Sequence, residues 1–239
     1  MKKLVVITGA SSGIGEALAK RFSEAGYPLL LVARRIEKLR ALNLPNCLCE
    51  QVDVTDKNSF SNAVAKAEAL YGPVECLINN AGVMLLGQIE SQNSEQWKKM
   101  FDVNVLALLG AMQVVLSAMK ERKSGTIINV SSVAGRKTFA NHAAYCGTKF
   151  AVSAISENVR EEVADFGVRV TSICPGAVDT ELLSHTTSNE IKKGYEDWKQ
   201  TMGGALVADD VARAALFVHQ QPQAVCIREL LITATRQQP

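Results

Sequence analysis

The sequence predicts a single α/β domain built on a doubly wound parallel sheet with helices on both faces. Three observations favour this fold class: the chain has 239 residues, 47% of them are hydrophobic, and short apolar runs alternate with helical patterns. This length fits one α/β domain, and the hydrophobic content is sufficient for a large core. We find no linker and no internal repeat, so one domain is expected over residues 1–239.

Six apolar runs are predicted to form the strands, and a seventh is a weaker candidate. Several of the runs are continuous rather than alternating, which is typical of strands buried on both faces of a parallel sheet. The six are Leu4–Thr8, Leu29–Ala33, Cys76–Asn79, Thr126–Val130, Arg169–Cys174 and Glu229–Thr233, and the weaker one is Cys47–Val54. Right-handed crossovers between parallel strands place the intervening helices on the two faces of the sheet.

Between these runs, apolar residues recur every three or four positions, which is the period of an amphipathic helix. The first helix is expected over Gly13–Gly26, where the glycine suits the position just after a helix end. Further helices are expected over Asp56–Tyr71, over Ser94–Arg122 and from Ala143 towards Phe166. Ser94–Arg122 is apolar on much of its surface, which indicates burial on two sides, one of them against a partner subunit.

The region Thr180–Leu206 interrupts the alternation of strands and helices. It follows the carboxyl end of a strand, where ligands bind in such sheets, so we interpret residues 180–206 as a lid on the substrate side. Its candidate lining residues, each equally compatible with simple helix packing, are Leu182, Leu183, His185, Tyr195, Trp198 and Met202.

Charge and cysteine content disfavour several classes of protein. The chain has 26 basic and 24 acidic residues, so nucleic acid is not expected as its main partner. No apolar run approaches the length of a membrane span, and the run that follows Lys2 and Lys3 is too short for a secretion signal. Six scattered cysteines without a C-x-x-C pattern, together with three histidines, predict neither a metal site nor a disulfide framework. We therefore expect a cytoplasmic protein.

The first predicted strand runs directly into a glycine-rich turn that opens a helix, Thr8-Gly9-Ala10-Ser11-Ser12-Gly13-Ile14-Gly15. Glycines permit a tight turn, and the unpaired N–H groups of a helix N-terminus attract a phosphate. The spacing is G-x-x-x-G-x-G, which differs from the common G-x-G-x-x-G fingerprint. We predict that this turn binds the phosphates of a dinucleotide rather than being an ordinary strand-to-helix turn.

The second predicted strand ends in Ala33-Arg34-Arg35, at the position that selects between dinucleotides. An acidic residue there accepts a hydrogen bond from the ribose 2′-OH of NAD, whereas a nearby arginine suits the 2′-phosphate of NADP. The nearest acid, Glu37, lies beyond the turn. The pattern therefore predicts NADP(H), with two solvated arginines as the simpler alternative.

Tyr145 and Lys149 stand four residues apart and therefore on one face of the predicted helix. A phenol has a pKa of about 10, and a neighbouring ammonium lowers it towards the range that proton transfer near neutral pH requires. Ser132 ends a strand at the same edge of the sheet, where its hydroxyl is placed to bond a substrate carbonyl. No histidine has the context of a Ser-His-Asp hydrolase. Together these residues indicate acid–base chemistry at a carbonyl.

These motifs resemble those of the short-chain dehydrogenase/reductase family over nearly the whole chain. The matching segments are Thr8–Gly15, Asp53-Val54, Asn79-Asn80-Ala81-Gly82, the tetrad Asn104, Ser132, Tyr145 and Lys149, and Pro175-Gly176 with Thr180. The resemblance implies a Rossmann-type fold and a hydride transfer between NADP(H) and a small carbonyl or alcohol substrate. Because the family commonly forms tetramers, it also implies a homotetramer or homodimer.

The resemblance also implies individual roles. Tyr145 would exchange the proton, Lys149 would lower its pKa and bind the nicotinamide ribose, Ser132 would orient the carbonyl, and Asn104 would hold a water. Asn104 has the alternative of bonding only its backbone, and Thr180 that of capping a helix. The residues implied to bind the cofactor are Gly9, Ser11, Ser12, Gly13, Ile14, Gly15, Arg34, Arg35, Asp53, Val54, Asn80, Ala81, Gly82, Tyr145, Lys149, Pro175, Gly176, Val178 and Thr180.

A closer resemblance is to a bacterial subgroup of that family, the NADPH-dependent blue fluorescent proteins. It is carried by the opening MKKLVVITGASSGIGEALAKRFSEAG, the stretch TELLSHTTS and the ending TRQQP. It implies that bound NADPH, held extended and rigid, emits blue light. An NADPH-binding fluorescent or sensor protein with little turnover is therefore the alternative to an enzyme, although the complete tetrad favours the enzyme.

Overall fold

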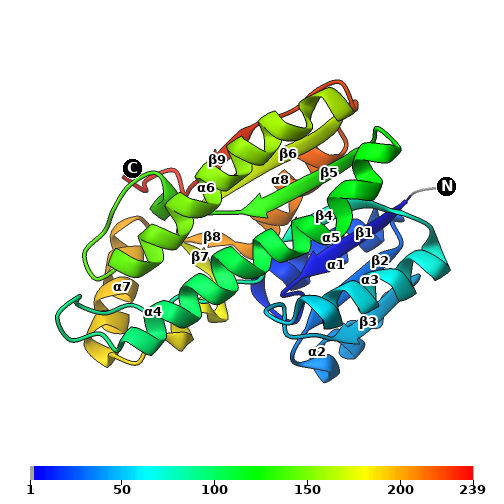
Figure 1. The fold of residues 1–239 in the computed structure, drawn as a ribbon. Helices are drawn as coiled ribbons and strands as arrows, with labels where there is room; N and C mark the ends of the chain where they lie inside the picture. The colour runs from blue at the N-terminus through cyan, green and yellow to red at the C-terminus, as the bar shows by residue number, and fades with distance from the viewer. Residues whose placement is uncertain (1–2, 239) are drawn as a thin grey trace.

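The computed structural model describes residues 3–238 and confirms the predicted fold class. Seven parallel strands form one sheet in the order β3-β2-β1-β4-β5-β6-β9 (Figure 1). The strands are β1 (Leu4–Thr8), β2 (Leu29–Ala33), β3 (Cys47–Gln51), β4 (Val74–Asn79), β5 (Gly125–Val130), β6 (Val168–Pro175) and β9 (Glu229–Ile232). All seven predicted strands are present, and the weaker candidate ends at Gln51 rather than at Val54.

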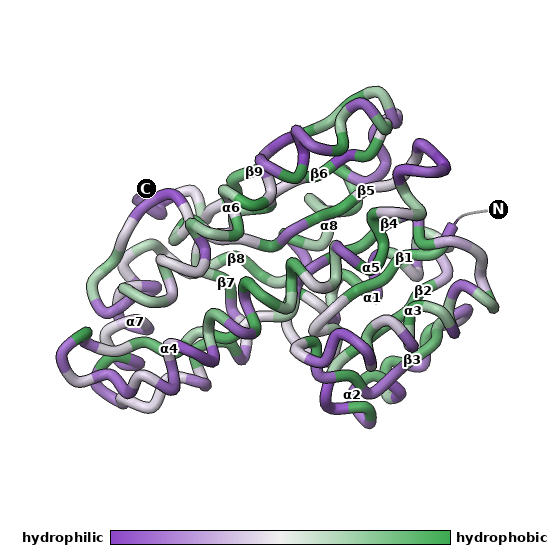
Figure 2. Tube along the Cα trace, in the orientation of Figure 1, coloured by the Kyte–Doolittle hydropathy of each residue, from purple (hydrophilic) through white to green (hydrophobic). Residues whose placement is uncertain are grey.

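Helices cover both faces of this sheet (Figure 1). One core joins the sheet to α1 (Gly13–Glu24), α2 (Ile36–Ala41) and α8 (Ala208–His219). The other joins it to α3 (Lys57–Tyr71), α5 (Ala107–Glu121) and α6 (Ala143–Val163). Because both faces are covered, every residue of β1, β2 and β5 is buried, which explains their continuous apolar sequences (Figure 2).

Most predicted helix boundaries are confirmed by identifiable caps. The Asp56 carboxylate accepts hydrogen bonds from the backbone N–H groups of Asn58 and Ser59, so α3 begins at Lys57. Gly26 follows the end of α1 with a φ of +81°, a left-handed conformation that favours glycine.

The expected helix Ser94–Arg122 is interrupted, which the sequence did not predict. It consists of α4 (Ser94–Phe101), a π-helical turn (Asp102–Leu106) and α5, which ends at Glu121. The turn contains Asn104, whose side chain accepts a hydrogen bond from Val83 N at 2.8 Å and donates one to Val83 O at 2.9 Å. Single π turns of this kind occur frequently at functional sites.

The whole helical stretch Ser94–Glu121 is long and apolar enough to cross a membrane by length and composition alone. Core helices of globular domains pass the same test, and here α5 packs against α3 and the sheet strands β4 and β5. Several apolar side chains of the stretch nevertheless remain exposed, among them Phe101, Leu106 and Leu109.

The predicted lid forms a separate group of short elements after β6. The predicted range 180–206 contains a 3-10 turn (Glu181–His185) and the helix α7 (Asn189–Thr201). It is bounded by the strands β7 (Val178–Asp179) and β8 (Leu206–Val207), which pair with each other. In Figure 1, α7 lies with α4 at the end of the molecule that the carboxyl ends of the strands face.

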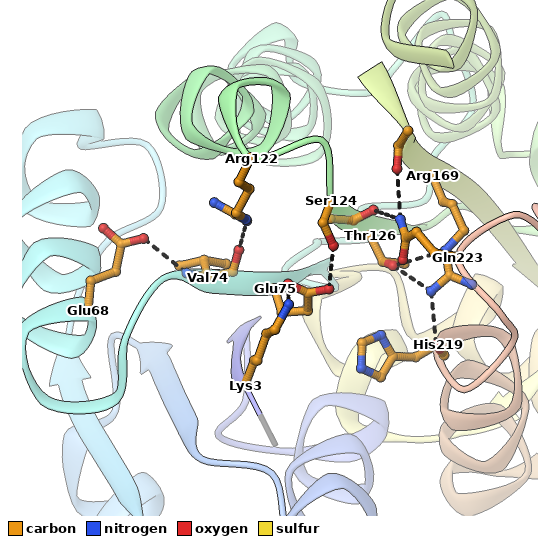
Figure 3. A network of polar contacts seen from close by, with 12 residues as sticks. Lys3, Glu68, Val74, Glu75, Arg122, Ser124, Thr126, Arg169, His219 and Gln223 are labelled. Carbon is orange, nitrogen blue, oxygen red and sulfur yellow. Dashed lines mark hydrogen bonds and ion pairs between the residues drawn. The ribbon is translucent and has the colours of Figure 1, made fainter. Parts of the chain in front are cut away.

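The opposite end of the sheet is held by polar contacts around the starts of β4, β5 and β6 (Figure 3). Arg169 of β6 is only 5% exposed, and its guanidinium donates to Thr126 Oγ1 at 2.7 Å and to the backbone oxygens of Gln221 at 2.8 Å and His219 at 2.9 Å. Burial lowers the pKa of Arg169. This arginine therefore ties β5, β6 and the chain after α8 together.

Replacing Arg169 tests this structural role. Arg169→Leu removes the donor to two buried oxygens and one partly buried oxygen, so we expect a loss of about 3 kcal/mol in the free energy of unfolding, measured with urea. Arg213→Ala removes an arginine whose side chain is 61% exposed, and a change within about 0.5 kcal/mol is expected. Equal losses in the two variants would contradict the role of Arg169.

Candidate functional site

A cavity of about 1120 Å³ opens at the carboxyl ends of the strands. It lies where the strand order reverses between β1 and β4, the point at which ligands bind in open α/β sheets. Pockets for a single ligand usually measure about 300–1,000 Å³. This cavity is therefore large enough for a cofactor together with a substrate.

The glycine turn forms one wall of the cavity. Gly9 and Gly13 have φ values of +67° and +57°, which favour glycine. A Cβ at Gly9 would lie 2.8 Å from Ala81 Cα, and one at Gly15 would lie 2.2 Å from Gly9 O. Gly15 itself does not line the cavity but allows α1 to pack closely beneath the turn. The bare backbone at the N-terminus of α1 fits a pyrophosphate.

Thr8 joins this turn to the end of β4. Its hydroxyl oxygen accepts hydrogen bonds from the backbone N–H groups of Asn80 and Ala81, both at 3.0 Å. Asn80 Nδ2 donates back to Thr8 O at 3.0 Å. These contacts place Asn80, Ala81 and Gly82 in the cavity lining, together with Ser11, Ser12 and Ile14 from the turn.

Asp53 and Val54 line the cavity beyond β3. The Asp53 carboxylate accepts hydrogen bonds from Thr55 N at 3.0 Å and Thr55 Oγ1 at 2.7 Å. The backbone hydrogen bond from Thr55 lowers the pKa of Asp53. The carboxylate is thus held ionised at the rim of the cavity.

Arg34 and Arg35 both line the cavity, and Arg35 crosses the glycine turn. Its guanidinium donates to Ser12 Oγ at 2.7 Å and to Ser11 Oγ at 3.2 Å, and it pairs with the Glu181 carboxylate at 2.9 Å. Lys38 Nζ lies 3.0 Å from the other oxygen of Glu181. Two cations thus converge on the Glu181 carboxylate, and one of them, Arg35, is also held by two serine hydroxyls.

The Glu181 carboxylate is held ionised by this arrangement. Its hydrogen bonds with Arg35 and Lys38 lower the pKa of Glu181 to about 2. Neither Lys38 nor Glu181 was predicted from the sequence. Lys38 could have been suspected only because it lies three residues after Arg35, in the helix that follows. Nothing in the sequence around Glu181 indicates that its carboxylate meets these cations.

Tyr145, Lys149 and Ser132 come together at the floor of the cavity, and all three are at most 9% exposed. Lys149 Nζ lies 5.8 Å from the centroid of the Tyr145 ring and donates to Val130 O at 2.9 Å. The Ser132 side chain is hydrogen-bonded to Tyr145. The predicted convergence of these three groups is therefore present.

The predicted lowering of the tyrosine pKa is not found. Burial raises the pKa of Tyr145, and the hydrogen bond with Ser132 opposes this only in part. Burial also lowers the pKa of Lys149 to about 8. Because both groups are desolvated, burial outweighs the attraction that the spacing of the two residues suggested.

Asn104 lies beneath the cavity rather than in its lining. Besides its two contacts with Val83, its Nδ2 donates to Thr148 Oγ1 at 3.1 Å. Both amide hydrogens and the amide oxygen are thus engaged, so the side chain fixes the Val83 segment against α6. Its alternative reading, bonding only its own backbone, is wrong.

The segment predicted to be a lid contributes to the lining of the cavity. Five of the six expected residues line the cavity: Leu182, Leu183, His185, Tyr195 and Trp198. Met202 does not, because it is buried with 5% exposure after the end of α7. Pro175, Gly176, Val178 and Thr180 also line the cavity, and Thr180 additionally caps the 3-10 turn through Leu182 N at 3.3 Å.

Two lining residues that sequence reasoning missed are Phe139 and His142, in the loop before α6. The loop carries no recognisable motif, so its place beside the cavity is seen only in the folded structure. Within residues 3–238, no group of three or more His, Cys, Asp or Glu side chains is arranged to hold a metal ion.

The sequence model of the family described as short chain dehydrogenase matches residues 3–191. The chain belongs to this family. An uncharacterized oxidoreductase of Staphylococcus saprophyticus is 38% identical over 98% of this chain and 97% of its own length. This short-chain dehydrogenase also resembles several solved protein structures over nearly the whole of both chains.

Two of these solved structures are described with a bound cofactor. The closed form of serine dehydrogenase complexed with NADP+ is 32% identical, has a TM-score of 0.92, and the match covers 99% of this chain and 96% of that one. ElxO with NADP bound is 28% identical with a TM-score of 0.86, and the match covers 97% of each chain.

Proposed function

We propose that this short-chain dehydrogenase is an NADP(H)-dependent oxidoreductase that acts on a carbonyl or alcohol, with Tyr145 as general acid and base. The observation that carries the proposal is the meeting of buried Tyr145, Lys149 and Ser132 in the same cavity as the glycine turn. The solved relatives described with NADP support the cofactor. When bound, NADPH supplies a hydride to the carbonyl carbon.

The side chains supply the proton and hold the carbonyl. Ser132 bonds the carbonyl oxygen, and Tyr145 donates its hydroxyl proton to the same oxygen. The raised pKa of Tyr145 keeps the phenol protonated until the substrate oxygen gains negative charge. The Lys149 ammonium, 5.8 Å from the ring centroid, then stabilises the phenolate.

Asn104 has a positioning role in this mechanism. Its contacts hold Val83 and Thr148 in place, and Thr148 precedes Lys149 in α6. Asn104 Oδ1 accepts one hydrogen bond, from Val83 N, and keeps a second lone pair that can accept a hydrogen bond from a water of the proton relay.

Replacing Tyr145 tests the proton donor. Tyr145→Phe removes the hydroxyl but keeps the ring, so kcat for carbonyl reduction is expected to fall at least about 100-fold. NADPH affinity should change by less than about threefold, because the phenol supplies at most one of many cofactor contacts. Tyr71→Phe, at the end of α3 and outside the cavity lining, is the matched control and should retain the parental kcat. A Tyr145→Phe enzyme as active as the parent would refute the assignment.

The anion site formed by Arg35 and Lys38 is proposed to bind the 2′-phosphate of NADP(H). In the structure a carboxylate, that of Glu181, lies between these two cations. Both ion pairs involve half-exposed side chains and are therefore weak, so a phosphate dianion can exchange with the carboxylate. The second predicted arginine, Arg34, lines the cavity beside them.

Cofactor selectivity tests this site. The double variant Arg34→Ala with Arg35→Ala should raise the Kd for NADPH at least about tenfold and leave that for NADH within about twofold, because only NADPH carries the 2′-phosphate. Both values can be measured by calorimetric titration. Arg40→Ala, in the helix α2 that follows the two arginines and outside the cavity lining, is the control. Equal weakening of both cofactors would show that the arginines do not read the phosphate.

We further propose, from the resemblance to the blue fluorescent subgroup, that the protein enhances the blue emission of NADPH. The narrow glycine turn and the lid support this, because a cofactor held between them is kept from stacking on itself. In that alternative the protein is an NADPH-binding fluorescent or sensor protein with little turnover.

Mixing the purified protein with NADPH tests the fluorescence proposal. A several-fold rise in blue emission over free NADPH is expected, and it should be lost in the double arginine variant at cofactor concentrations below its Kd. The same samples heated until unfolded provide the baseline. Emission equal to that of free NADPH, at a concentration where calorimetry shows saturation, would contradict the proposal.

We also propose a homotetramer or homodimer in the cytoplasm. Exposed apolar side chains on α4, the π turn and α5, including Phe101 and Leu106, lie beside Phe150 on α6, and Leu231 is exposed on the edge strand β9. These surfaces suit contact with further copies of the chain. The cytoplasm is supported by six free cysteines.

A further inference from the structure

Four aromatic rings extend from Tyr145 along the substrate side of the cavity. The His142 ring lies 6.2 Å from the Tyr145 ring and 6.2 Å from the Tyr195 ring, between centroids. Trp198 lies 5.4 Å from Tyr195 and 6.1 Å from Phe139. All of these residues line the cavity. We call Phe139, His142, Tyr195 and Trp198 the ring wall.

The ring wall is assembled from two separate parts of the chain. Phe139 and His142 come from the loop before α6, whereas Tyr195 and Trp198 come from the lid helix α7. Leu182, Leu183 and Ile191 of the lid also line the cavity and belong to the same apolar cluster as Tyr145 and Tyr195. The site beside the proton donor therefore has a wall of aromatic and aliphatic groups, and uncharged polar side chains such as Gln92, Gln96 and Asn141 also line the cavity.

The charges at this end of the cavity do not offer a partner for an anion. Lys199 lines the cavity but is paired with Asp179 at 2.8 Å and Glu196 at 2.7 Å. Burial lowers the pKa of both His142 and His185 below the ordinary value, so both are neutral near pH 7. The other charged residue that the lid helix contributes to the lining is Glu190, which is acidic.

The remaining cations of the described lining are committed elsewhere. Arg34 and Arg35 stand at the glycine turn, and Arg35 is bonded there to Ser11, Ser12 and Glu181. Lys149 is only 7% exposed, donates to Val130 O, and lies with its Nζ 5.8 Å from the centroid of the Tyr145 ring, whose phenolate its charge is proposed to stabilise. A substrate carboxylate beside the ring wall would lose its water without gaining a free cation, which is strongly unfavourable.

We propose that the substrate is a neutral carbonyl compound that bears an aromatic ring on or next to the carbonyl carbon, or the corresponding alcohol. This inference rests on the proposed function. In the reduction, the carbonyl carbon gains the hydride that NADPH supplies and the carbonyl oxygen gains the Tyr145 proton. The products are the aryl alcohol and NADP+, and Tyr145 recovers its proton from solvent.

The proposal separates this chain from the solved relative that is described as serine dehydrogenase. Serine carries a carboxylate and an ammonium group, and the ring wall offers no free cation to pair with the carboxylate. Rings of a substrate instead contact the faces and edges of Tyr195 and Trp198, in the geometries that aromatic pairs prefer.

Two matched pairs of aldehydes test charge and aromaticity with the full-length protein and saturating NADPH. Methyl 4-formylbenzoate and 4-formylbenzoate differ in charge, whereas benzaldehyde and cyclohexanecarbaldehyde differ in the ring. We expect kcat/KM at least about tenfold higher for the ester than for the acid. We expect it about 3- to 10-fold higher for benzaldehyde than for cyclohexanecarbaldehyde. Acetoacetate, and serine with NADP+, serve as small charged comparisons.

Two tryptophan variants test the ring wall itself. Trp198→Leu should bring the benzaldehyde to cyclohexanecarbaldehyde ratio close to one. Trp97→Leu replaces the other tryptophan of the chain, which donates to Gln92 and does not line the cavity, and should leave that ratio unchanged. Circular dichroism and NADPH binding establish that each variant is folded.

The outcomes distinguish this inference from the proposed function. A preference for 4-formylbenzoate, acetoacetate or serine would overturn the inference and leave the oxidoreductase function standing. An unchanged ratio in Trp198→Leu would also overturn it. If none of these substrates changes the oxidation state of a cofactor that calorimetry shows to be bound, both the inference and the proposed catalytic function fail.

Discussion

The site depends on the hydrogen bonds that the Thr8 hydroxyl accepts from Asn80 N and Ala81 N. Thr8 is the last residue of β1 and Asn80 follows β4, so these bonds join the two strands between which the strand order reverses. Joining them brings the backbone at Ala81 so close to Gly9 that no Cβ fits there. The same closeness at Gly15 lets α1 begin directly beneath the turn. The bare backbone surface that we propose for phosphate binding is therefore a consequence of how two strands are held together.

The end of β5 imposes a second constraint, which concerns charge. Lys149 is buried with its ammonium on the carbonyl of Val130, and its own carbonyl accepts a hydrogen bond from Ser131 Oγ at 3.1 Å. A carboxylate partner would have neutralised this ammonium and kept its pKa high. Burial with only a carbonyl lowers the pKa to about 8 instead, and the positive charge stays available to a phenolate on the neighbouring turn of α6. Burial without a carboxylate partner thus lowers the pKa of Lys149 and leaves its charge unpaired, as the proposed acid–base pair requires.

The sequence predicted the parts of the molecule that local patterns determine. All seven strands of the main sheet were predicted, most of them from continuous apolar runs, whereas the short strands β7 and β8 were missed. The turn, Ser132, Tyr145 and Lys149 were found because their spacing is local. The π turn at Asn104 was missed because it depends on contacts with Val83, far away in the chain. The pairing of Arg35 with Glu181 spans 146 positions, and the sign of the Tyr145 pKa shift depends on burial. Neither can be read from spacing, because both arise only when distant segments pack.

The segment predicted to be a lid reaches the cavity at two places, through the 3-10 turn and through α7, and a buried residue lies between them. The 3-10 turn places Glu181 against Arg35 and Lys38, and α7 places Tyr195 and Trp198 in the ring wall. Between them, Thr186 is 1% exposed, and its hydroxyl accepts a hydrogen bond from Leu86 N at 3.1 Å and donates one to Met84 O at 3.3 Å. If a phosphate replaces Glu181, as proposed, the buried Thr186 is a fixed point that separates the 3-10 turn from α7. In the proposed function, residues for cofactor binding and for substrate recognition are thus carried by one segment, on either side of a buried anchor.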